Sequence, residues 1–105
     1  MKQEMKEIEI NILAEKIKYI EENLSRAINI QNILRTEGDE ISSVKVRNLY
    51  IDRNEYISNI LRELDSLGYE VTYLRPWQKD VSKQMSVIIH FFEDVKEVEK
   101  RQKMA

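Results

Sequence analysis

The fold of this 105-residue chain is decided by its first third, which contains the stretch INILAEKIKYIEENLSRAINIQNIL (residues 10–34). Apolar residues recur there at alternating intervals of three and four, with Gln31 taking one turn of the pattern: Ile10, Leu13, Ile17, Ile20, Leu24, Ala27 and Leu34. This spacing is the heptad pattern of a helix that packs against another helix. It predicts one helix from Glu4 to Thr36, closed by Gly38 in the left-handed conformation.

The length of this helix suggests assembly. About 33 residues at 1.5 Å each give a rod of about 50 Å, whereas a compact chain of this size has a diameter of roughly 35 Å. We therefore predict that part of the apolar seam is covered by a second copy, in a dimer or a higher oligomer. The predicted interface residues are Ile10, Leu13, Ile17, Ile20, Leu24 and Gln31, with Gln31 fixing the register.

Composition limits the remaining possibilities. With 42% hydrophobic and 34% charged residues, the chain suits a single ordered domain over residues 1–105. A net charge of -2 gives no general attraction to nucleic acid, and the absence of cysteine excludes disulfides and thiolate sites. The first residues resemble no signal peptide and no run approaches about 20 apolar residues, so we expect a cytoplasmic protein that does not enter a membrane.

Residues 41–93 predict a small α+β body. Residues 41–51 are rich in β-formers and predict a strand, although the alternation slips at Asn48, which leaves open whether the strand is bulged or has ended. A helix follows from Arg53 to Leu67, with Asp52 as its N-cap and Gly68 as its closing residue.

Two further strands complete the predicted sheet. Residues 69–75 alternate and precede Pro76, and residues 85–92 form an apolar run typical of an inner strand. We expect these two strands to pair antiparallel, followed by a charged helical tail over residues 94–105. The predicted fold class is therefore α+β, with a long N-terminal helix and a small, mainly antiparallel sheet.

The sequence offers little that points to catalysis. The only histidine, His90, falls in the apolar run, where a single titratable group is usually structural. Neither cysteine nor a second histidine is present to complete a metal site or a nucleophilic triad. Carboxylate pairs stay open, because 19 acidic residues allow many pairings and single out none. We predict no catalytic residue, no metal and no cofactor.

The segment from Tyr73 to Lys83 departs most from a purely structural pattern. It places the only tryptophan beside an arginine and two lysines, a combination that can stack a ring and neutralise a phosphate. The candidate ligand-binding residues are Arg47, Tyr73, Arg75, Trp77, Lys79 and His90, with Arg53 as a possible addition. The alternative is that Trp77 folds back as a lid on the core and that the lysines are only solvated.

The second half also resembles a family of small proteins. Ile57, Ile60, Leu61, Leu64 and Leu67 lead into Gly68-Tyr69-Glu70-Val71 and later into Ser86-Val-Ile-Ile-His90-Phe. This pattern, from Arg53 to Phe92, resembles small α+β accessory proteins of phages and mobile elements. The resemblance implies a protein that binds a host protein or sequesters a signalling nucleotide, and it carries over no functional residue.

Three functions follow from these patterns. The first is a non-enzymatic homo-oligomeric accessory protein that binds a partner protein through helix and loop surfaces. The second is a phage-type binder that sequesters a small nucleotide at a subunit interface, as an anti-defence protein would. A transcriptional regulator ranks last, because Arg53 and Arg62 in the second helix are balanced by acidic residues.

Overall fold

The chain is a three-helix protein. The computed structural model describes residues 7–104, and the side chains of residues 13–102. Over this range the helices are α1 (Glu7–Glu37), α2 (Ser43–Ser66) and α3 (Ser82–Met104), and no strand is present. The predicted α+β class, with its small antiparallel sheet, is therefore wrong.

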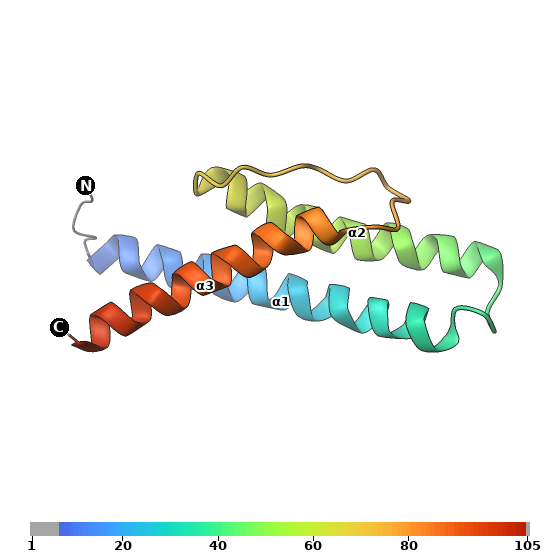
Figure 1. Cartoon of the computed structure of the whole chain (residues 1–105), viewed down its shortest axis with the longest axis horizontal. Coiled ribbons are helices and arrows are strands. Elements are labelled where there is room, and N and C mark those ends of the chain that lie inside the picture. Colours follow the sequence, from blue (N-terminus) through green and yellow to red (C-terminus); the bar gives the residue numbers. More distant parts are fainter. Residues whose placement is uncertain (1–6, 105) are drawn as a thin grey trace.

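The three helices form an elongated molecule. α1 and α2 run antiparallel around a short turn, and α3 starts beside the middle of α2 and runs toward the beginning of α1 (Figure 1). The molecule measures 53 × 23 × 20 Å, with α1 lying close to its long axis. Because the body is itself elongated, the length of α1 does not by itself require a second copy to cover it.

The core lies between one face of α1 and the apolar faces of the other two helices. Its buried members are Ile20, Ala27, Ile57, Ile60, Leu61, Leu64, Ile88 and Phe91. Ile20, Ala27 and Leu34 are seven residues apart and all buried, so the helix predicted from the heptad pattern is confirmed from Glu7 onward. Its predicted start at Glu4 lies outside the described residues. Its seam packs, however, on helices of the same chain.

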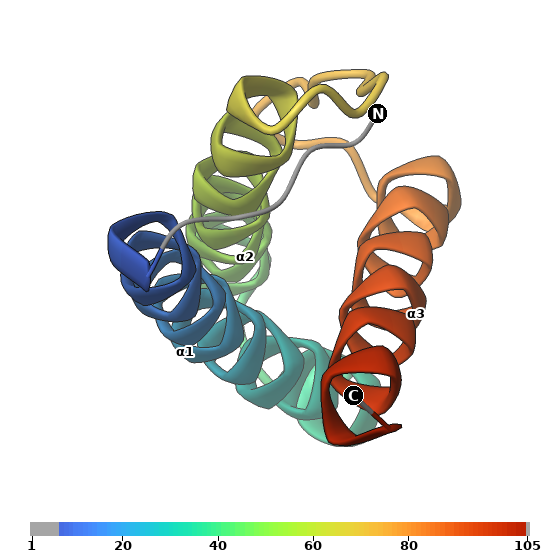
Figure 2. The same ribbon diagram turned by 90° about the vertical axis from the view of Figure 1, so that its left-hand side faces the viewer.

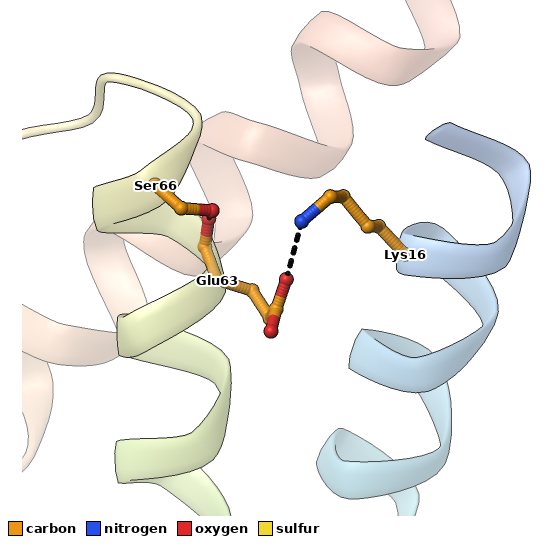
Figure 3. A network of polar contacts seen from close by, with 3 residues as sticks. All are labelled: Lys16, Glu63 and Ser66. Carbon is orange, nitrogen blue, oxygen red and sulfur yellow. Dashed lines mark hydrogen bonds and ion pairs between the residues drawn. The ribbon is translucent and has the colours of Figure 1, made fainter. Parts of the chain in front are cut away.

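Polar contacts also join α1 to α2. Lys16 donates a hydrogen bond of 2.9 Å to Glu63, whose backbone carbonyl accepts from the Ser66 hydroxyl (Figure 3). Deeper in the interface, the amide of Asn59 donates to Asn23 at 3.0 Å. The ion pair is partly exposed and contributes at most about 1 kcal/mol, so the apolar contacts supply most of the stability.

α2 begins ten residues earlier than predicted. Ser42 is the N-cap and accepts a hydrogen bond from the backbone N–H of Lys45 at 3.2 Å, so Asp52 lies inside the helix. The expected strand over residues 41–51 is wrong because its alternation covers only Val44 and Val46. The change of parity at Asn48 reflects helical periodicity that continues from Val46 through Tyr50 to Arg53.

α3 replaces the predicted inner strand at residues 85–92. Gln84, Ile88 and Phe91 are buried and Val95 is half-buried, which are the intervals of one helix face. An eight-residue apolar run fits a buried strand and a buried helix equally, and only the continuation of the pattern past Phe92 separates them. The predicted helical tail is the second half of this helix, as far as Met104.

An extended connector, residues 67–81, joins α2 to α3. It starts where Gly68 adopts φ 98°, while Gly68 N–H bonds Asp65 and Tyr69 N–H bonds Leu64, which is a Schellman motif. This confirms Gly68 as the closing residue. The predicted left-handed conformation of Gly38 is wrong, because its φ is not positive. A Cβ there would instead lie 2.4 Å from the Leu34 carbonyl oxygen.

The left-handed conformation of Gly68 gives a direct test of the α2 terminus. Gly68→Ala should lower the free energy of unfolding by about 1–2 kcal/mol, because an L side chain strains this conformation. Gly68→Asn should cost less, because asparagine tolerates the left-handed region. Urea unfolding monitored by circular dichroism measures both values, and equal stability of wild type and Gly68→Ala would contradict the assigned conformation.

Candidate functional site

A buried arginine occupies the centre of the molecule. Arg53 is only 2% exposed, although it lies near the middle of α2. Its guanidinium donates to Gln31 Oε1 of α1 at 2.6 Å and to the carbonyl oxygens of Gln78 and Lys79 at 2.8 and 3.1 Å. Two further bonds, of 3.0 and 2.8 Å, go to Asn54 Oδ1. One side chain thus links α1, α2 and the connector.

Two neutral amides complete the attachment of the connector. The Asn54 side-chain amide donates to the carbonyl oxygens of Arg75, Pro76 and Gln78 at 2.8–3.2 Å. From α3, the Gln84 amide donates to the Thr72 carbonyl oxygen at 2.8 Å. Because no strand within residues 7–104 pairs with the connector, these side chains replace the hydrogen bonds that a sheet would supply.

Aromatic rings cover the outer side of this centre. The Arg53 guanidinium lies 4.8 Å from the centroid of the Tyr50 ring, and the Lys79 ammonium lies 5.8 Å from the same ring. One turn earlier on α2, Arg47 stacks on the Trp77 ring at 4.0 Å. Cation–π contacts of this kind stabilise by about 0.5–2 kcal/mol each. Arg47–Trp77 and Lys79–Tyr50 join α2 to the connector and help to hold it there.

The charge of Arg53 has no carboxylate partner among the described residues. Its acceptors are all neutral oxygens. Desolvation by burial lowers the pKa of Arg53 from its ordinary value, as expected for a cation with no compensating charge. The guanidinium still remains charged, because the pKa of arginine lies above about 12 in water.

Arg53 forms part of the wall of a cavity, which we call the Arg53 cavity. The cavity has a volume of about 370 Å³ and lies between α1, α2 and the first turn of α3. Its apolar lining consists of Leu24, Ala27, Ile28, Ile57, Val81 and Met85. Gln31, Arg53, Lys79, Asp80 and Ser82 supply the polar groups. A largely apolar cavity with a few convergent polar groups is typical of small-molecule sites.

A second hollow, the α1–α3 groove, lies at the other end of the molecule. Its volume is about 310 Å³ and it is lined mainly by Leu13, Ile17, Leu67, Phe91, Val95 and Val98. Asp94 and Tyr69 stand at its edge, where the Tyr69 hydroxyl donates a hydrogen bond to the carboxylate. Burial and this bond raise the pKa of Tyr69 well above its ordinary value.

The structure divides the predicted ligand-binding residues between different places. Arg47 and Trp77 contact each other, with Trp77 56% exposed, and Lys79 lines the Arg53 cavity. Tyr73 instead donates a hydrogen bond of 3.2 Å to Asp65.

The last two predicted ligand residues lie apart from the cavity. Arg75 is exposed and lines a shallow hollow beside α2. His90 is an exposed residue of α3 with Glu93 and Asp94 each 3.9 Å from its ring, so its predicted place in a strand is wrong.

Most of the predicted interface residues whose side chains are described contact other parts of the same chain. Ile20 is fully buried, Ile17 and Leu24 pack on the core, and Gln31 accepts the bond from Arg53. Leu13 lines the α1–α3 groove. The side chain of Ile10 lies outside the described residues, so its predicted role stays untested.

Sequence reasoning missed the residues that hold the centre together. Asn54 and Gln84 have no predicted role, and Arg53 is predicted as an addition to a loop site or as a basic residue of a DNA-binding helix, not as a buried residue. A signal was present, because Arg53 precedes Ile57 by four residues and Gln84 precedes Ile88 by four, which places polar residues on apolar helix faces. Buried polar groups need hydrogen-bond partners, so these positions pointed to an internal polar contact.

No protein-family model, curated protein or solved structure matches this chain. Within the described part of the chain, no three acidic or histidine side chains come together in a way that could hold a metal ion. No described helix has both the length and the apolar character needed to cross a membrane. The resemblance to phage accessory proteins therefore stays a hypothesis, and its predicted hairpin is absent from residues 7–104.

The role of Asn54 can be tested by truncation. Asn54→Ala removes donors from three connector carbonyl groups and should lower the free energy of unfolding by about 1–3 kcal/mol. Hydrogen exchange of the amides in residues 69–81 should become faster than in wild type. Glu55→Ala, at an exposed neighbouring position, is the control. Unchanged exchange in Asn54→Ala would show that other contacts hold the connector.

The hydrogen bonds of Asp80 at the start of α3 lead us to expect that the stability of the fold depends on pH. Hydrogen bonds from the hydroxyl and then the backbone N–H of Ser82 lower the pKa of Asp80 below its ordinary value. Because the pKa of Asp80 is lower in the folded state, its ionised carboxylate stabilises the fold above about pH 4. This stabilisation is lost as the pH falls through the folded-state pKa. The stability advantage of wild type over Asp80→Asn should therefore shrink between pH 6 and pH 3 in urea unfolding. Asp39→Asn controls for the loss of one surface charge, and a constant advantage would contradict the prediction.

Proposed function

We propose that this chain is a non-enzymatic interaction protein that assembles with a second copy of itself through the α1–α3 groove. The observation that carries the proposal is the open arrangement of the helices at this end. The start of α1 and the end of α3 extend past the end of α2, and the two helices are splayed apart there (Figures 1 and 2).

α1 and α3 do not pack directly on each other along the groove. No Cα atoms of the described parts of α1 and α3 lie within 8 Å of each other, yet apolar side chains of both helices face the space between them. Val98 is 41% exposed at this place. Apolar surface of this kind gains roughly 25 cal/mol per Å² when it is removed from water.

A second copy suits this end of the molecule. Two projecting helices from each chain, related by a two-fold axis, would make a four-helix arrangement with a shared apolar centre. The end of α3 carries both signs of charge, with Lys96, Lys100 and Arg101 beside Glu97 and Glu99. Antiparallel copies of such a helix can pair opposite charges around the apolar contact.

The function of the assembly follows the first of the three predicted roles, in which a small accessory protein presents helix surfaces to a partner protein. Support comes from the groove rather than from the length of α1. Sequestration of a nucleotide at a subunit interface stays a prediction, because the structure of one chain gathers no full set of the residues expected for it.

The proposal predicts a dimer that depends on Val98. Wild type should sediment as a dimer at micromolar concentration, and Val98→Glu should raise the dissociation constant at least tenfold, which corresponds to about 1.4 kcal/mol. Ile89→Glu is the matched control, because Ile89 is 55% exposed on the same helix but does not line the groove. Analytical ultracentrifugation gives both constants.

Two results would contradict the proposal. The first is a wild-type chain that stays monomeric up to millimolar concentration. The second is a dimer that Ile89→Glu disrupts and Val98→Glu leaves intact, because the interface would then lie on another face of α3. Circular dichroism of both variants is the check that each keeps the helical fold.

A further inference from the structure

The Arg53 cavity combines three features that no single structural role explains. Its wall contains a buried guanidinium, most of its surface is aliphatic, and its ionisable groups carry unequal charge. Arg53 and Lys79 are cations, whereas Asp80 is the single carboxylate among the described lining residues. The balance of two positive charges against one negative charge leaves a net charge of +1.

The carboxylate of Asp80 does not neutralise Arg53. Its Oδ1 atom accepts from the Ser82 backbone N–H at 3.0 Å and from the Ser82 hydroxyl at 2.7 Å. No ion pair within 4 Å joins Asp80 to Arg53 or to Lys79 among the residues described. The described lining therefore keeps an uncompensated positive charge at the buried Arg53 guanidinium, beside apolar side chains.

Arg53 also keeps hydrogen-bonding capacity. A guanidinium has five N–H groups. The Nε and Nη2 atoms bond Asn54 and the connector carbonyl oxygens, and Nη1 bonds only Gln31 within the described structure. One N–H of Nη1 is left for another acceptor. The side-chain nitrogen of Gln31, which also lines the cavity, likewise has no acceptor in the described range.

From this arrangement we propose that the Arg53 cavity binds a small organic anion with an aliphatic body. The anionic head, a carboxylate or a phosphate monoester, accepts from Arg53 Nη1 and is attracted by Lys79. The hydrocarbon body lies against Leu24, Ile28 and Met85. The lining contains no aromatic ring, which favours an aliphatic body over a nucleobase. The volume of about 370 Å³ lies within the range of small-molecule pockets.

The two possible heads are distinguished by the choice of probes. Decanoate, decyl phosphate and decanol share one aliphatic chain and differ only in the head. Decanoate or decyl phosphate should raise the melting temperature and give a measurable heat of binding in titration calorimetry, because binding to the folded state stabilises it. The tighter of the two identifies the head. Decanol should bind at least tenfold more weakly, because it cannot use the charge.

Variants then locate the site. Lys79→Glu should weaken binding of the tighter anion about tenfold, through loss of one attraction and gain of one repulsion. Lys100→Glu, which changes the same charge on the exposed end of α3, should bind like wild type. Ile28→Trp lies at a cavity position that is partly exposed. It should weaken the binding of the anion and of decanol alike, because the larger side chain fills the cavity.

Arg53→Gln should abolish the preference for the anions over decanol. If Arg53→Gln fails to fold, the comparison of heads in wild type and the Lys79→Glu result decide alone. Equal affinity for decanol and the anions, no binding of either anion at millimolar concentration, or unchanged affinity in Lys79→Glu would each overturn the proposal. Val98→Glu should bind the anion like wild type, which separates this site from the groove at the other end.

Discussion

The structure depends on how an extended segment is held without a sheet. Residues 67–81 cross the surface of α2, and carbonyl groups along this path need donors because no strand lies beside them. Arg53, Asn54 and Gln84 provide those donors from the two flanking helices. The connector fixes where α3 begins, so these bonds also determine the space between α3 and α1. The cavity and the groove are both consequences of that placement.

The helices could be predicted where their apolar pattern is long. The heptad of the first third runs over several turns, and Ile57, Ile60, Leu61 and Leu64 mark a helix face that ends at Gly68. The wrong secondary-structure predictions fall in shorter stretches of the sequence. Residues 85–92 are apolar on every side, and strand and helix differ there only in how the pattern continues to Val95 and Val98. β-branched residues near Val44 added a local preference that the longer helix overrides.

The candidate site could be predicted only in part. Its helix residues leave a pattern in the sequence, whereas the connector groups that they bond do not. Arg53 and Asn54 are recognisable as polar residues in phase with an apolar helix face. Their acceptors in the connector are backbone carbonyl groups, which leave no signature in side-chain identity. The predicted interface role of Ile20 and Leu24 stays untested, and both side chains pack within the chain itself. A heptad pattern shows that a seam needs cover, but it does not show that α2 and α3 of the same chain supply it.

The arginine at position 53 belongs both to the contacts that hold the fold and to the proposed anion site. Burying a cation without a counter-charge costs several kcal/mol, and hydrogen bonds to neutral oxygens offset this only in part. Asn54 shows that an uncharged amide can hold three connector carbonyl groups without that cost. Attachment of the connector therefore explains the donors of Arg53 but not its charge. The charge has a function when an anion enters the cavity beside Arg53. Binding then requires no further desolvation of the guanidinium, because that desolvation has already occurred on folding.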